Sequence, residues 1–483
     1  MKVLAFDFGA SSGRAILGTY EGGKLTLEEI HRFDNEPVKM NGSFFWDLPR
    51  LFHEIKQGLI KAEPYDYDFI GIDTWGVDYA LLTADGLLLG NPYHYRDERT
   101  MPVFENFKTK MPEAELYRKT GIQNLNFNTM YQLLETKENH PELYALADKM
   151  ILIPDLFGYL LTGKIYAERS IASTTQLLTP DTKEWNIPLI KELGLNEKIF
   201  PELVDSGVQV APLREELCRE LNIKPKMLIA VPEHDTASAV AAVPASTKDF
   251  VYISCGTWSL FGTELNAPCI TDMSAEMNIT NESGHDRTTR FLKNIIGLWM
   301  IQETRRQFKR DGKNYSYADM EAMAREAQPF KCFINPDDVR FSTPGNQIAR
   351  IKEFCAETNQ PMPETDGEVV RCIYESLAMK YKYTFENLRK CTGHNFDAIH
   401  MVGGGTKDGF LCQMTADATS TPVVAGPIEA TAAGNIAVQL IAAGEISDLA
   451  EARKVIADSL EVVKYAPNDS GFDKEYARFC EIL

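Results

Sequence analysis

The sequence lacks any long uncharged hydrophobic run. No stretch of about 18 apolar residues occurs, so we expect no membrane-spanning helix. The N-terminal apolar run Val3–Phe6 ends at the acidic residue Asp7, and no small-residue cleavage site follows, unlike a secretory signal peptide. From these absences we expect a cytoplasmic protein that does not associate with membranes.

Basic residues are also scarce relative to acidic ones. Lys and Arg total 50 against 69 Asp and Glu, which gives a formal net charge of −19. This balance disfavours non-specific binding to nucleic acid or to an anionic membrane. An anionic ligand stays compatible with it, because glycine-rich loops and a bound cation reverse the local field.

Cysteine and histidine show no pattern typical of a metal site. The nine cysteines are scattered without a C-x-x-C pair, and the eight histidines have no metal-ligand spacing. We therefore expect a protein with reduced thiols and without structural zinc. Whether Cys355 and Cys372 meet in the fold and form a disulfide stays open.

The two halves of the chain share a pattern. The 483 residues, 44% hydrophobic and 25% charged, form a folded protein too long for a single core. Residues 3–9 predict a strand that runs into a small-residue turn, and residues 14–18 predict a returning strand. Near residue 250 the pattern recurs, with residues 250–254 as the strand and 258–262 as its return.

Each half also contains an apolar strand that ends at a small-residue loop. These strands are residues 69–73 and 398–402. Helical periodicity predicts helices over 48–62 and 367–391, the second with Asp366 as its N-cap. Strands separated by amphipathic helices predict an α/β fold with mixed sheets flanked by helices.

We place the domain boundary in the linker Pro244–Lys248. The predicted domains are residues 1–244 and 245–483, facing each other across a cleft lined by small-residue loops.

The loop Gly9–Gly13 allows three interpretations. It is a plain β-turn, or it is a phosphate loop whose N–H groups and hydroxyls act with Arg14, while Asp7 holds a hydrated Mg²⁺. It also matches the G-x-S-x-G motif of serine hydrolases, with Ser11 as nucleophile. That motif joins a strand to a helix, whereas the residues that follow here predict a second strand.

Two small-residue segments of the second half are candidates for nucleotide contact. Gly403–Lys407 follows a predicted strand but does not fit a Walker A loop, because the lysine follows Thr406 and no hydroxyl follows it. Its glycines approach either a nucleotide base or ribose, or they form a tight strand–helix junction. Residues 431–435 start a small-residue helix, for which adenosine contact is possible but not specific.

The segment Glu233–Ala239 brings a carboxylate to the start of a small-residue helix. Asp235 either caps this helix or accepts a proton from a sugar hydroxyl. A triad of Ser11, His234 and Asp235 is a poor hypothesis, because neighbouring residues on a strand point to opposite faces. We therefore expect His234 and Asp235 not to pair readily.

Two further segments, residues 73–78 and 93–100, are dense in aromatic and charged groups. Carbohydrate sites use this combination, with rings against the apolar face of the sugar and charges on its hydroxyls. Loops held by salt bridges are the alternative.

Together these segments resemble the FGGY carbohydrate kinase family, within the actin-like ATPase group. The resemblance runs from about Val3 to Pro467. The segments that carry it are Asp7–Arg14, Gly71–Leu82, Tyr95–Thr100, His234–Val240, Gly256–Gly262, Leu292–Gln302, Phe333–Phe341 and Gly403–Lys407. Residues 73–78 and 292–299 look more like members that phosphorylate L-rhamnulose than like those that phosphorylate glycerol or xylulose.

This resemblance implies two actin-like (ribonuclease H-like) domains, the first for the sugar and the phosphates and the second for the nucleotide. It implies ATP-dependent phosphorylation of the 1-hydroxyl of L-rhamnulose, with Asp235 as general base and Asp7 associated with Mg²⁺ through water. It also implies sugar contacts at Gly76, His234, Asp235, Thr236 and Asn294, and ATP contacts at Ala10, Ser11, Ser12, Gly13, Arg14, Thr257, Gln302 and Gly404.

Other functions stay open beside this one. Another ketose, such as L-fuculose or L-ribulose, is the main competing substrate. A serine hydrolase acting through Ser11 and a non-catalytic sensor of sugar or nucleotide are the alternatives outside the kinases.

Overall fold

The computed structural model describes residues 1–247 and 249–483, and it confirms an α/β fold with mixed sheets. Lys248, the last residue of the predicted linker, lies outside the described residues. The chain forms two compact units that are not continuous in sequence. The first contains Met1–Ser246, Glu264–Phe291 and Glu429–Leu460, and the second Thr247–Thr263, Leu292–Ile428 and Glu461–Leu483.

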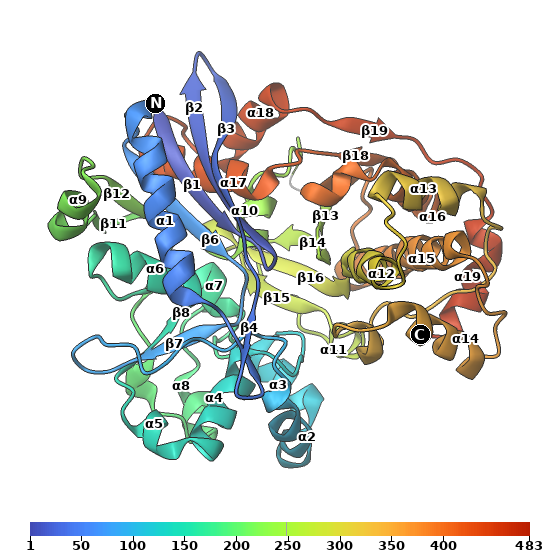
Figure 1. Ribbon diagram of the computed structural model, residues 1–483, viewed down its shortest axis with the longest axis horizontal. Helices are drawn as coiled ribbons and strands as arrows, with labels where there is room; N and C mark the ends of the chain where they lie inside the picture. Colours follow the sequence, from blue (N-terminus) through green and yellow to red (C-terminus); the bar gives the residue numbers. More distant parts are fainter. Residues whose placement is uncertain (248) are drawn as a thin grey trace. The chain divides into compact units, whose positions relative to one another are not determined.

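The first unit is built on a six-stranded sheet (Figure 1), in the order β11-β12-β6-β1-β2-β3. The central strands β1, β6 and β12 are parallel to one another, while β2, β3 and β11 are antiparallel to their neighbours. These strands are β1 (Lys2–Phe8), β2 (Ser12–Glu21), β3 (Lys24–Asp34), β6 (Phe69–Thr74), β11 (Val208–Pro212) and β12 (Met227–Ala230). Because β1, β6 and β12 are parallel, their carboxyl ends lie at one edge of the sheet.

Helices cover both faces of this sheet. On one face lie α1 (Leu48–Ala62) and α6 (Ile153–Thr162), and on the other lie α10 (Asp235–Ala241) and α17 (Ala430–Ala442). Helix α1 has the bounds expected from its periodicity and buries Leu51, Ile55 and Leu59. Its Gly58 approaches Phe6 of β1 so closely that a Cβ would lie 2.5 Å from the ring.

The small residues of α17 are explained by packing within the first unit. A Cβ on Gly434 would lie 1.8 Å from the carbonyl oxygen of Ser238 in α10, and a Cβ on Gly71 would lie 2.3 Å from Asn435. The small-residue segment 431–435 therefore allows close approach of a helix to α10 and β6. The contact with adenosine considered from the sequence is not needed to account for these residues.

The remaining elements of the first unit form short hairpins and helices beside the sheet. The strands are β4 (Val38–Met40), β5 (Ser43–Phe45), β7 (Tyr79–Leu82), β8 (Lys149–Leu152), β9 (Ala167–Glu168), β10 (Leu203–Val204) and β15 (Thr280–Ser283). The helices are α2 (Met101–Lys110), α3 (Glu113–Thr120), α4 (Thr129–Asn139), α5 (Pro141–Ala145), α7 (Arg169–Ser173), α8 (Ile187–Glu192), α9 (Glu215–Leu221), α11 (Asp272–Glu276) and α18 (Leu449–Ser459).

In the second unit, β13 pairs with β14 antiparallel and with β17 parallel, and β18 and β19 continue the sheet beyond β17. These strands are β13 (Val251–Cys255), β14 (Trp258–Leu265), β17 (Ile399–Val402), β18 (Val423–Ala425) and β19 (Val463–Tyr465), and β16 (Thr289–Ile296) continues into this unit. Its helices are α12 (Trp299–Arg310), α13 (Tyr317–Glu326), α14 (Gln347–Glu357), α15 (Asp366–Thr392), α16 (Gly409–Thr419) and α19 (Phe472–Cys480).

The long helix α15 begins one residue away from the expected cap. Asp366 is its first residue, and the N-cap is Thr365, whose hydroxyl accepts the amide of Glu368 in a capping box. The capping box satisfies backbone N–H groups at both ends of the first turn, which a cap at Asp366 would not do.

The pattern repeated along the sequence is confirmed as a repeated topology. Each unit has an antiparallel hairpin, β1–β2 or β13–β14, whose first strand pairs in parallel with a later strand, β6 or β17. The hairpin turns differ in length, since the amide of Gly9 donates to the carbonyl of Ser12, whereas the amide of Gly256 donates to that of Trp258.

All nine cysteines are free, including Cys355 and Cys372. These two do meet in the fold, where their thiols and that of Cys332 are hydrogen-bonded to one another. Within the described part of the chain, every helix is too short or too polar to cross a lipid bilayer.

Candidate functional site

Acidic residues gather at the carboxyl edge of the first sheet. Asp7 of β1 and Asp73 of β6 are partners in the parallel register, so their side chains lie on the same face. Arg14, opposite Asp7 on β2, forms ion pairs with Asp7 and with Glu429 at the start of α17. The Arg14 guanidinium thus offsets the negative charge at this edge.

Asp73 is fully buried and only partly satisfied. One of its oxygens accepts a 2.6 Å hydrogen bond from Asn435, while Oδ1 has no hydrogen-bond partner. Burial raises the pKa of Asp73 well above its ordinary value, and the charges of Asp7 and Asp235 raise it further. A cation or a donor beside Asp73 would favour the charged form of this carboxyl group.

The loop Gly9–Gly13 is the turn of the β1–β2 hairpin. Asn35 holds it by donating its side-chain amide to the carbonyl of Gly9 at 2.9 Å. A Cβ on Gly13 would lie 2.1 Å from the ring of Phe33, so this glycine is required by packing. The nucleophile-elbow hypothesis for Ser11 is wrong, because the turn joins two strands and not a strand to a helix.

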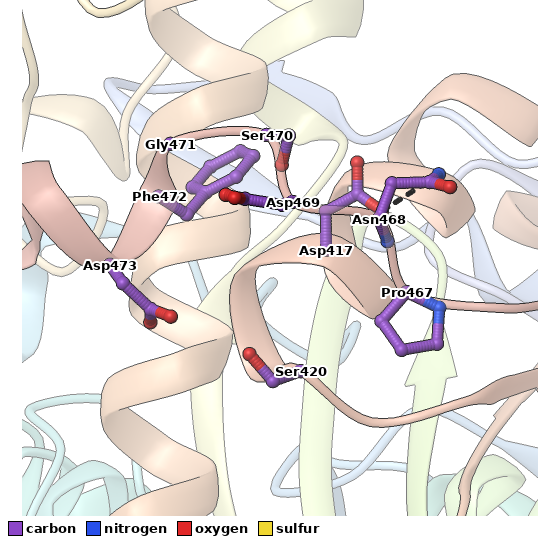
Figure 2. A pocket seen from close by; sticks show the side chains of 9 residues that line it. All are labelled: Asp417, Ser420, Pro467, Asn468, Asp469, Ser470, Gly471, Phe472 and Asp473. Carbon is purple, nitrogen blue, oxygen red and sulfur yellow. Dashed lines mark hydrogen bonds between the residues drawn. The ribbon is translucent and has the colours of Figure 1, made fainter.

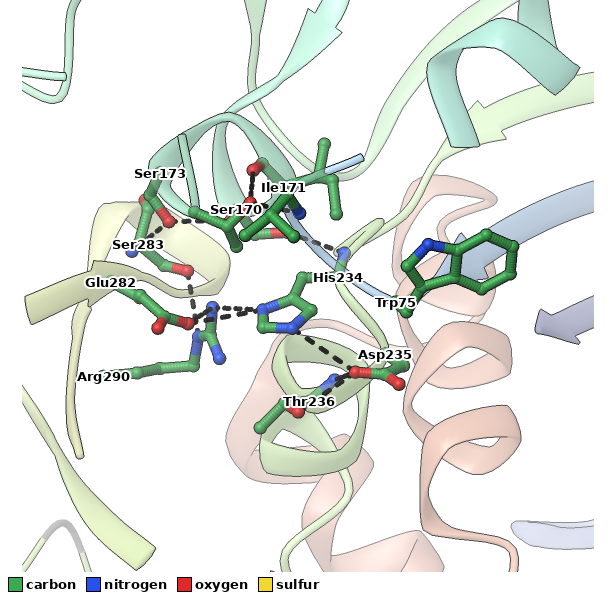
Figure 3. Close-up of polar contacts among 12 residues, drawn as sticks. Trp75, Ser170, Ile171, Ser173, His234, Asp235, Thr236, Glu282, Ser283 and Arg290 are labelled. Carbon is green, nitrogen blue, oxygen red and sulfur yellow. Dashed lines mark hydrogen bonds and ion pairs between the residues drawn. The ribbon is translucent and has the colours of Figure 1, made fainter. Parts of the chain in front are cut away.

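His234 and Asp235 stand where the chain passes from β12 into α10. His234 is the N-cap residue of α10 and Asp235 its first helical residue (Figure 3). The Nε2 atom of His234 lies 3.4 Å from Oδ1 of Asp235, so the expectation that the two would not pair is wrong. The two residues straddle a bend and not an extended strand, which turns both side chains to the same side.

One carboxylate oxygen of Asp235 accepts hydrogen bonds, while the side chain is partly exposed to solvent. Its Oδ1 accepts the amide of Thr236 at 2.5 Å and the hydroxyl of Thr236 at 3.0 Å. The cap considered from the sequence is wrong for Asp235, because His234 is the N-cap residue and Asp235 already lies inside the helix. The side chain is 30% exposed, against 9% for His234. Burial raises the pKa of Asp235, the neighbouring His234 lowers it, and the charge of Asp7 raises it.

Three buried carboxyl groups lie behind this bend. Glu233 and Asp155 are buried close to each other, and Tyr166 donates its hydroxyl to Glu233 at 2.9 Å. Glu168 accepts the amide of Glu233 at 3.1 Å. Burial raises the pKa of Glu233 and of Asp155 well above their ordinary values. The hydrogen bond from the amide of Glu233 to Glu168 fixes the backbone that enters α10.

The carbonyl of Gly76 and the amide of Asp78 form a tight turn around Val77. The hydrogen bond between them is 2.9 Å, and Val77 has φ of 69°. A positive φ at a β-branched residue is strained by about 1–3 kcal/mol. Two hydrogen bonds keep Val77 in this conformation. Its amide donates to the hydroxyl of Thr174 at 3.0 Å, and its carbonyl accepts the hydroxyl of Thr129 at 2.6 Å. Gly76 is the one partly exposed residue in the buried run from Ile70 to Leu82.

Asp78 is a fully buried acceptor for four N–H donors. Its Oδ2 accepts the indoles of Trp46 and Trp75 at 2.7 and 3.0 Å and the amide of Tyr95 at 3.1 Å. Its Oδ1 accepts the side chain of Gln132 at 2.9 Å. Burial raises the pKa of Asp78 to about 7, although the donors favour its charged form. Asp78 therefore joins four separate segments of the first unit.

The aromatic residues of 73–78 and 93–100 mainly stack on one another. The ring centroid of Trp46 lies 3.8 Å from that of Trp75 and 4.1 Å from that of His94. Arg99 forms an ion pair with Glu135 and stacks on Tyr93. The contacts of Arg99 favour the salt-bridged-loop interpretation, and burial lowers the pKa of His94 to about 3, which keeps it neutral.

The remaining predicted site residues lie in the second unit. Thr257 is in the β13–β14 turn, and its carbonyl accepts the amide of Trp299 at 3.1 Å. Asn294 is on β16 and Gln302 is in the first turn of α12, and both are half-buried.

The three glycines after β17 differ in what surrounds them. A Cβ on Gly405 would lie 2.3 Å from the sulfur of Cys255, and Gly403 has φ of 90° and faces the carbonyl of Cys255. These two glycines are explained by the junction with β13. A Cβ on Gly404 would meet nothing within 4 Å, and this residue is exposed. Gly404 alone of the three is open to a ligand.

A polar hollow elsewhere in the second unit does not contain predicted site residues (Figure 2). It lies between α16 and α19 and is lined by Asp417, Ser420, Pro467, Asn468, Asp469, Ser470, Gly471, Phe472 and Asp473. The carboxylate of Asp417 is already used there, because it accepts the amide of Asn468 at 2.9 Å and the side chain of Gln413 at 2.7 Å.

The acidic edge suits Mg²⁺ bound together with phosphate. Among the described residues, no group of three or more His, Cys, Asp or Glu side chains is arranged to hold a metal ion without help. Mg²⁺ usually keeps several waters and takes one or two carboxylates plus phosphate oxygens, so it does not need such a cage. Asp7, with the unpartnered Oδ1 of Asp73 on the neighbouring strand, supplies the oxygen donors that it prefers.

Several charged residues of this region are not evident from the sequence. Glu282 and Arg290 contact His234, and Glu429 pairs with Arg14 although the two are far apart in the chain. No sequence spacing links them, because they come together only through the fold. An acidic residue beside a buried arginine on adjacent predicted strands is the one signal for the Glu282–Arg290 pair.

Comparisons with known proteins agree along the whole chain. The sequence profiles of the FGGY family of carbohydrate kinases match residues 2–242 with the N-terminal domain and residues 251–443 with the C-terminal domain. A rhamnulokinase of Bacteroides thetaiotaomicron is 43% identical over 98% of this chain and 98% of its own. A rhamnulokinase of Bacillus subtilis is 42% identical over 97% of this chain and 96% of its own.

Solved structures share the fold at lower identity. A ligand-bound xylulose kinase of Lactobacillus acidophilus has a TM-score of 0.83 at 19% identity, covering 100% of this chain and 97% of that one. A glycerol kinase of Plasmodium falciparum with ADP has a TM-score of 0.78 at 15% identity, covering 99% and 97%. The fold is thus the two-domain actin-like fold expected from the sequence.

The contacts of Asp78 predict the effect of replacing it with asparagine. Asp78→Asn puts an NH₂ donor where N–H donors converge, so at least one buried donor loses its acceptor, and we expect a loss of about 1–3 kcal/mol in the free energy of unfolding. Chemical denaturation measures this loss, and NMR of the indole N–H groups of Trp46 and Trp75 should show both signals shifted. Unchanged stability and unchanged indole signals would contradict the assigned contacts.

Proposed function

Because the chain belongs to the FGGY family of carbohydrate kinases, we propose that it phosphorylates the 1-hydroxyl group of L-rhamnulose with ATP. The observation that carries this proposal is the similarity to proteins named rhamnulokinase, 43% identical over 98% of the chain. Sugar kinases of this family use ATP, and the proposed product is L-rhamnulose 1-phosphate, formed in L-rhamnose degradation.

Asp235 is the proposed general base. Its side chain is rigidly held through Oδ1 and is 30% exposed, so Oδ2 remains for a substrate hydroxyl. Burial raises the pKa of Asp235, which makes its carboxylate a stronger proton acceptor. The sugar hydroxyl passes its proton to Oδ2 while its oxygen attacks the γ-phosphorus, and the bond between that phosphorus and the leaving ADP oxygen breaks.

The edge around Asp7 is the proposed site for the phosphates. Mg²⁺ bound there would neutralise charge on the β- and γ-phosphates, and Asp7 would hold it through water. The turn Ala10–Gly13 offers backbone N–H groups and two hydroxyls, and Arg14 supplies a fixed positive charge beside Asp7. These groups orient the phosphates for transfer.

The other site residues are proposed by the same resemblance. The sugar contacts are Gly76, His234, Thr236 and Asn294, and the further ATP contacts are Thr257, Gln302 and Gly404. The open surroundings of Gly404 support its role.

We further propose that residues 1–244 carry sugar and phosphate binding and that residues 245–483 carry nucleotide binding. The free cysteines suit a reducing compartment such as the cytoplasm.

Kinetic comparison of sugars tests the proposed substrate. We expect the highest kcat/KM for L-rhamnulose in a coupled ADP-release assay with Mg-ATP that also includes L-fuculose, L-ribulose, D-xylulose and glycerol. A preference for L-fuculose or L-ribulose would overturn the substrate and keep the kinase. ATP binding without turnover on any sugar would favour a non-catalytic sensor.

Loss of the proposed base should slow the chemical step selectively. Asp235→Asn is expected to lower kcat by about 10²–10⁴-fold with ATP affinity nearly unchanged, because a general base acts on the transition state. Steady-state kinetics and ATP titration measure the two quantities. Asp66→Asn, at an exposed residue that pairs with Lys224, is the matched control. Full activity of Asp235→Asn would reject the assignment.

The surroundings of Gly404 make it a clean probe of nucleotide approach. Gly404→Val introduces a branched side chain into open space, so stability should be unchanged while KM for ATP rises. Thermal unfolding and ATP kinetics check both parts, and Gly404→Ala should give a smaller rise. An unchanged KM for ATP in the folded valine variant would remove Gly404 from the site.

A further inference from the structure

A buried ion pair lies behind His234, on residues that the proposed function does not assign. Glu282 is on β15 and Arg290 on β16, and Oε2 of Glu282 lies 3.0 Å from Nη2 of Arg290 (Figure 3). Arg290 is fully buried and Glu282 is 5% exposed. Burying two charges costs several kcal/mol per ion unless each has a partner, so this pair is held by mutual neutralisation.

The pair contacts one nitrogen of His234. Nη2 of Arg290 lies 3.0 Å from Nδ1 of His234, and Oε2 of Glu282 lies 3.3 Å from the same nitrogen. The other nitrogen, Nε2, lies 3.4 Å from Oδ1 of Asp235. The imidazole ring therefore connects the buried ion pair to the proposed base, as the dashed lines of Figure 3 show.

Arg290 is fixed from a second side. Its Nε donates to the carbonyl of Ser283 at 3.0 Å, and the amide of Ser283 donates to the hydroxyl of Ser173 at 2.9 Å. Lys183 lies near Arg290, where it donates to Thr289 at 2.9 Å. The Arg290 charge and the burial of Lys183 lower the pKa of Lys183 to about 8. The guanidinium thus keeps its orientation toward His234.

The chemistry of the two neighbours decides where the proton of His234 resides. A guanidinium only donates, so its approach to Nδ1 requires the lone pair of that nitrogen. Glu282 by itself would favour a proton on Nδ1. Arg290, however, lies closer to Nδ1 and neutralises the charge of Glu282 through their ion pair.

We propose that Glu282 and Arg290 are positioning residues that hold His234 as the neutral tautomer with its proton on Nε2, the nitrogen that faces Oδ1 of Asp235. With Thr236 donating to Oδ1, this oxygen is saturated. No described residue donates to Oδ2, which is then the oxygen that takes the proton of the sugar hydroxyl. Through His234, the ion pair thus determines which oxygen of Asp235 accepts the proton, and it fixes the orientation of the Asp235 carboxylate.

The consequence for the reaction rests on the proposed role of Asp235, but the tautomer itself is measurable without turnover. ¹⁵N NMR of the histidine-labelled protein at neutral pH, with His234→Asn to assign the signal, should show unprotonated Nδ1 and protonated Nε2. An imidazolium, or a proton on Nδ1, would overturn the inference. A wild-type protein that phosphorylates no sugar would refute the proposed function and leave this measurement intact.

Glu282→Gln tests the effect on catalysis. It removes the charge but keeps the shape, so we expect kcat to fall by about 10–100-fold, by analogy with the loss of an outer partner of a metal-binding histidine. KM for ATP should stay unchanged, and the NMR signal of His234 should change. A folded Glu282→Gln protein with wild-type kcat would overturn the inference.

The matched control is Glu375→Gln in α15. Glu375 is a buried glutamate whose Oε1 lies 2.7 Å from Nε of Arg371, so it reports the general cost of neutralising a buried Glu–Arg pair. We expect kcat of this control to stay near the wild-type value, and an equal loss in both variants would overturn the inference. Arg290→Lys, which keeps the charge but loses the planar fork, should also lower kcat. If neither variant at the pair folds, the tautomer in the wild-type protein decides.

Discussion

Repulsion among acidic groups at the carboxyl edge of the first sheet is the constraint on which the rest of the site depends. The parallel strands β1, β6 and β12 carry Asp7, Asp73 and Asp235 to this edge, where the charge of Asp7 raises the pKa of both Asp73 and Asp235. Two contacts offset this repulsion: Arg14 forms an ion pair with Asp7, and Asn435 donates a hydrogen bond to Asp73. An edge so arranged is negative enough to attract a divalent cation and yet contains one fixed positive charge for phosphate.

Buried carboxyl groups around this edge fall into two kinds. Asp78 and Glu233 are enclosed by donors or by another carboxyl group, and they join segments of the first unit. Asp235 differs, because one oxygen is fully used and its side chain is 30% exposed. A group that is rigid at one oxygen and open at the other is suited to directed proton transfer. The proposed base differs from its acidic neighbours because one of its carboxylate oxygens accepts hydrogen bonds and the other is left open.

Glycine shows how one residue type serves different purposes. Gly13, Gly405 and Gly434 are each required because a Cβ would collide with Phe33, Cys255 or the backbone of Ser238. Gly404 has no such neighbour. In the sequence, residues 403–405 form one motif of three glycines. In the structure, Gly403 and Gly405 are required by packing against Cys255, whereas Gly404 faces open space.

Much of the fold was predictable from local patterns. The bounds of α1, the repeated hairpins and the strands at 69–73 and 398–402 follow from periodicity, because burial of one helix face or of a whole strand leaves a regular apolar pattern. The family resemblance, carried by short motifs, also pointed to Asp235. The sequence could not predict the contact between His234 and Asp235, since the expectation of opposite faces assumed a strand that continues through the bend.

The sequence alone determined the α/β class, the kinase family and the set of candidate residues, because these depend on which residues follow one another. Tertiary structure decided which charges meet. Glu282 and Arg290 are brought to His234 by the β15–β16 hairpin, and Glu429 is brought to Arg14 by α17. Such pairs leave no spacing in the chain, since an ion pair needs only that two side chains lie within a few ångströms, whatever the distance between them in sequence.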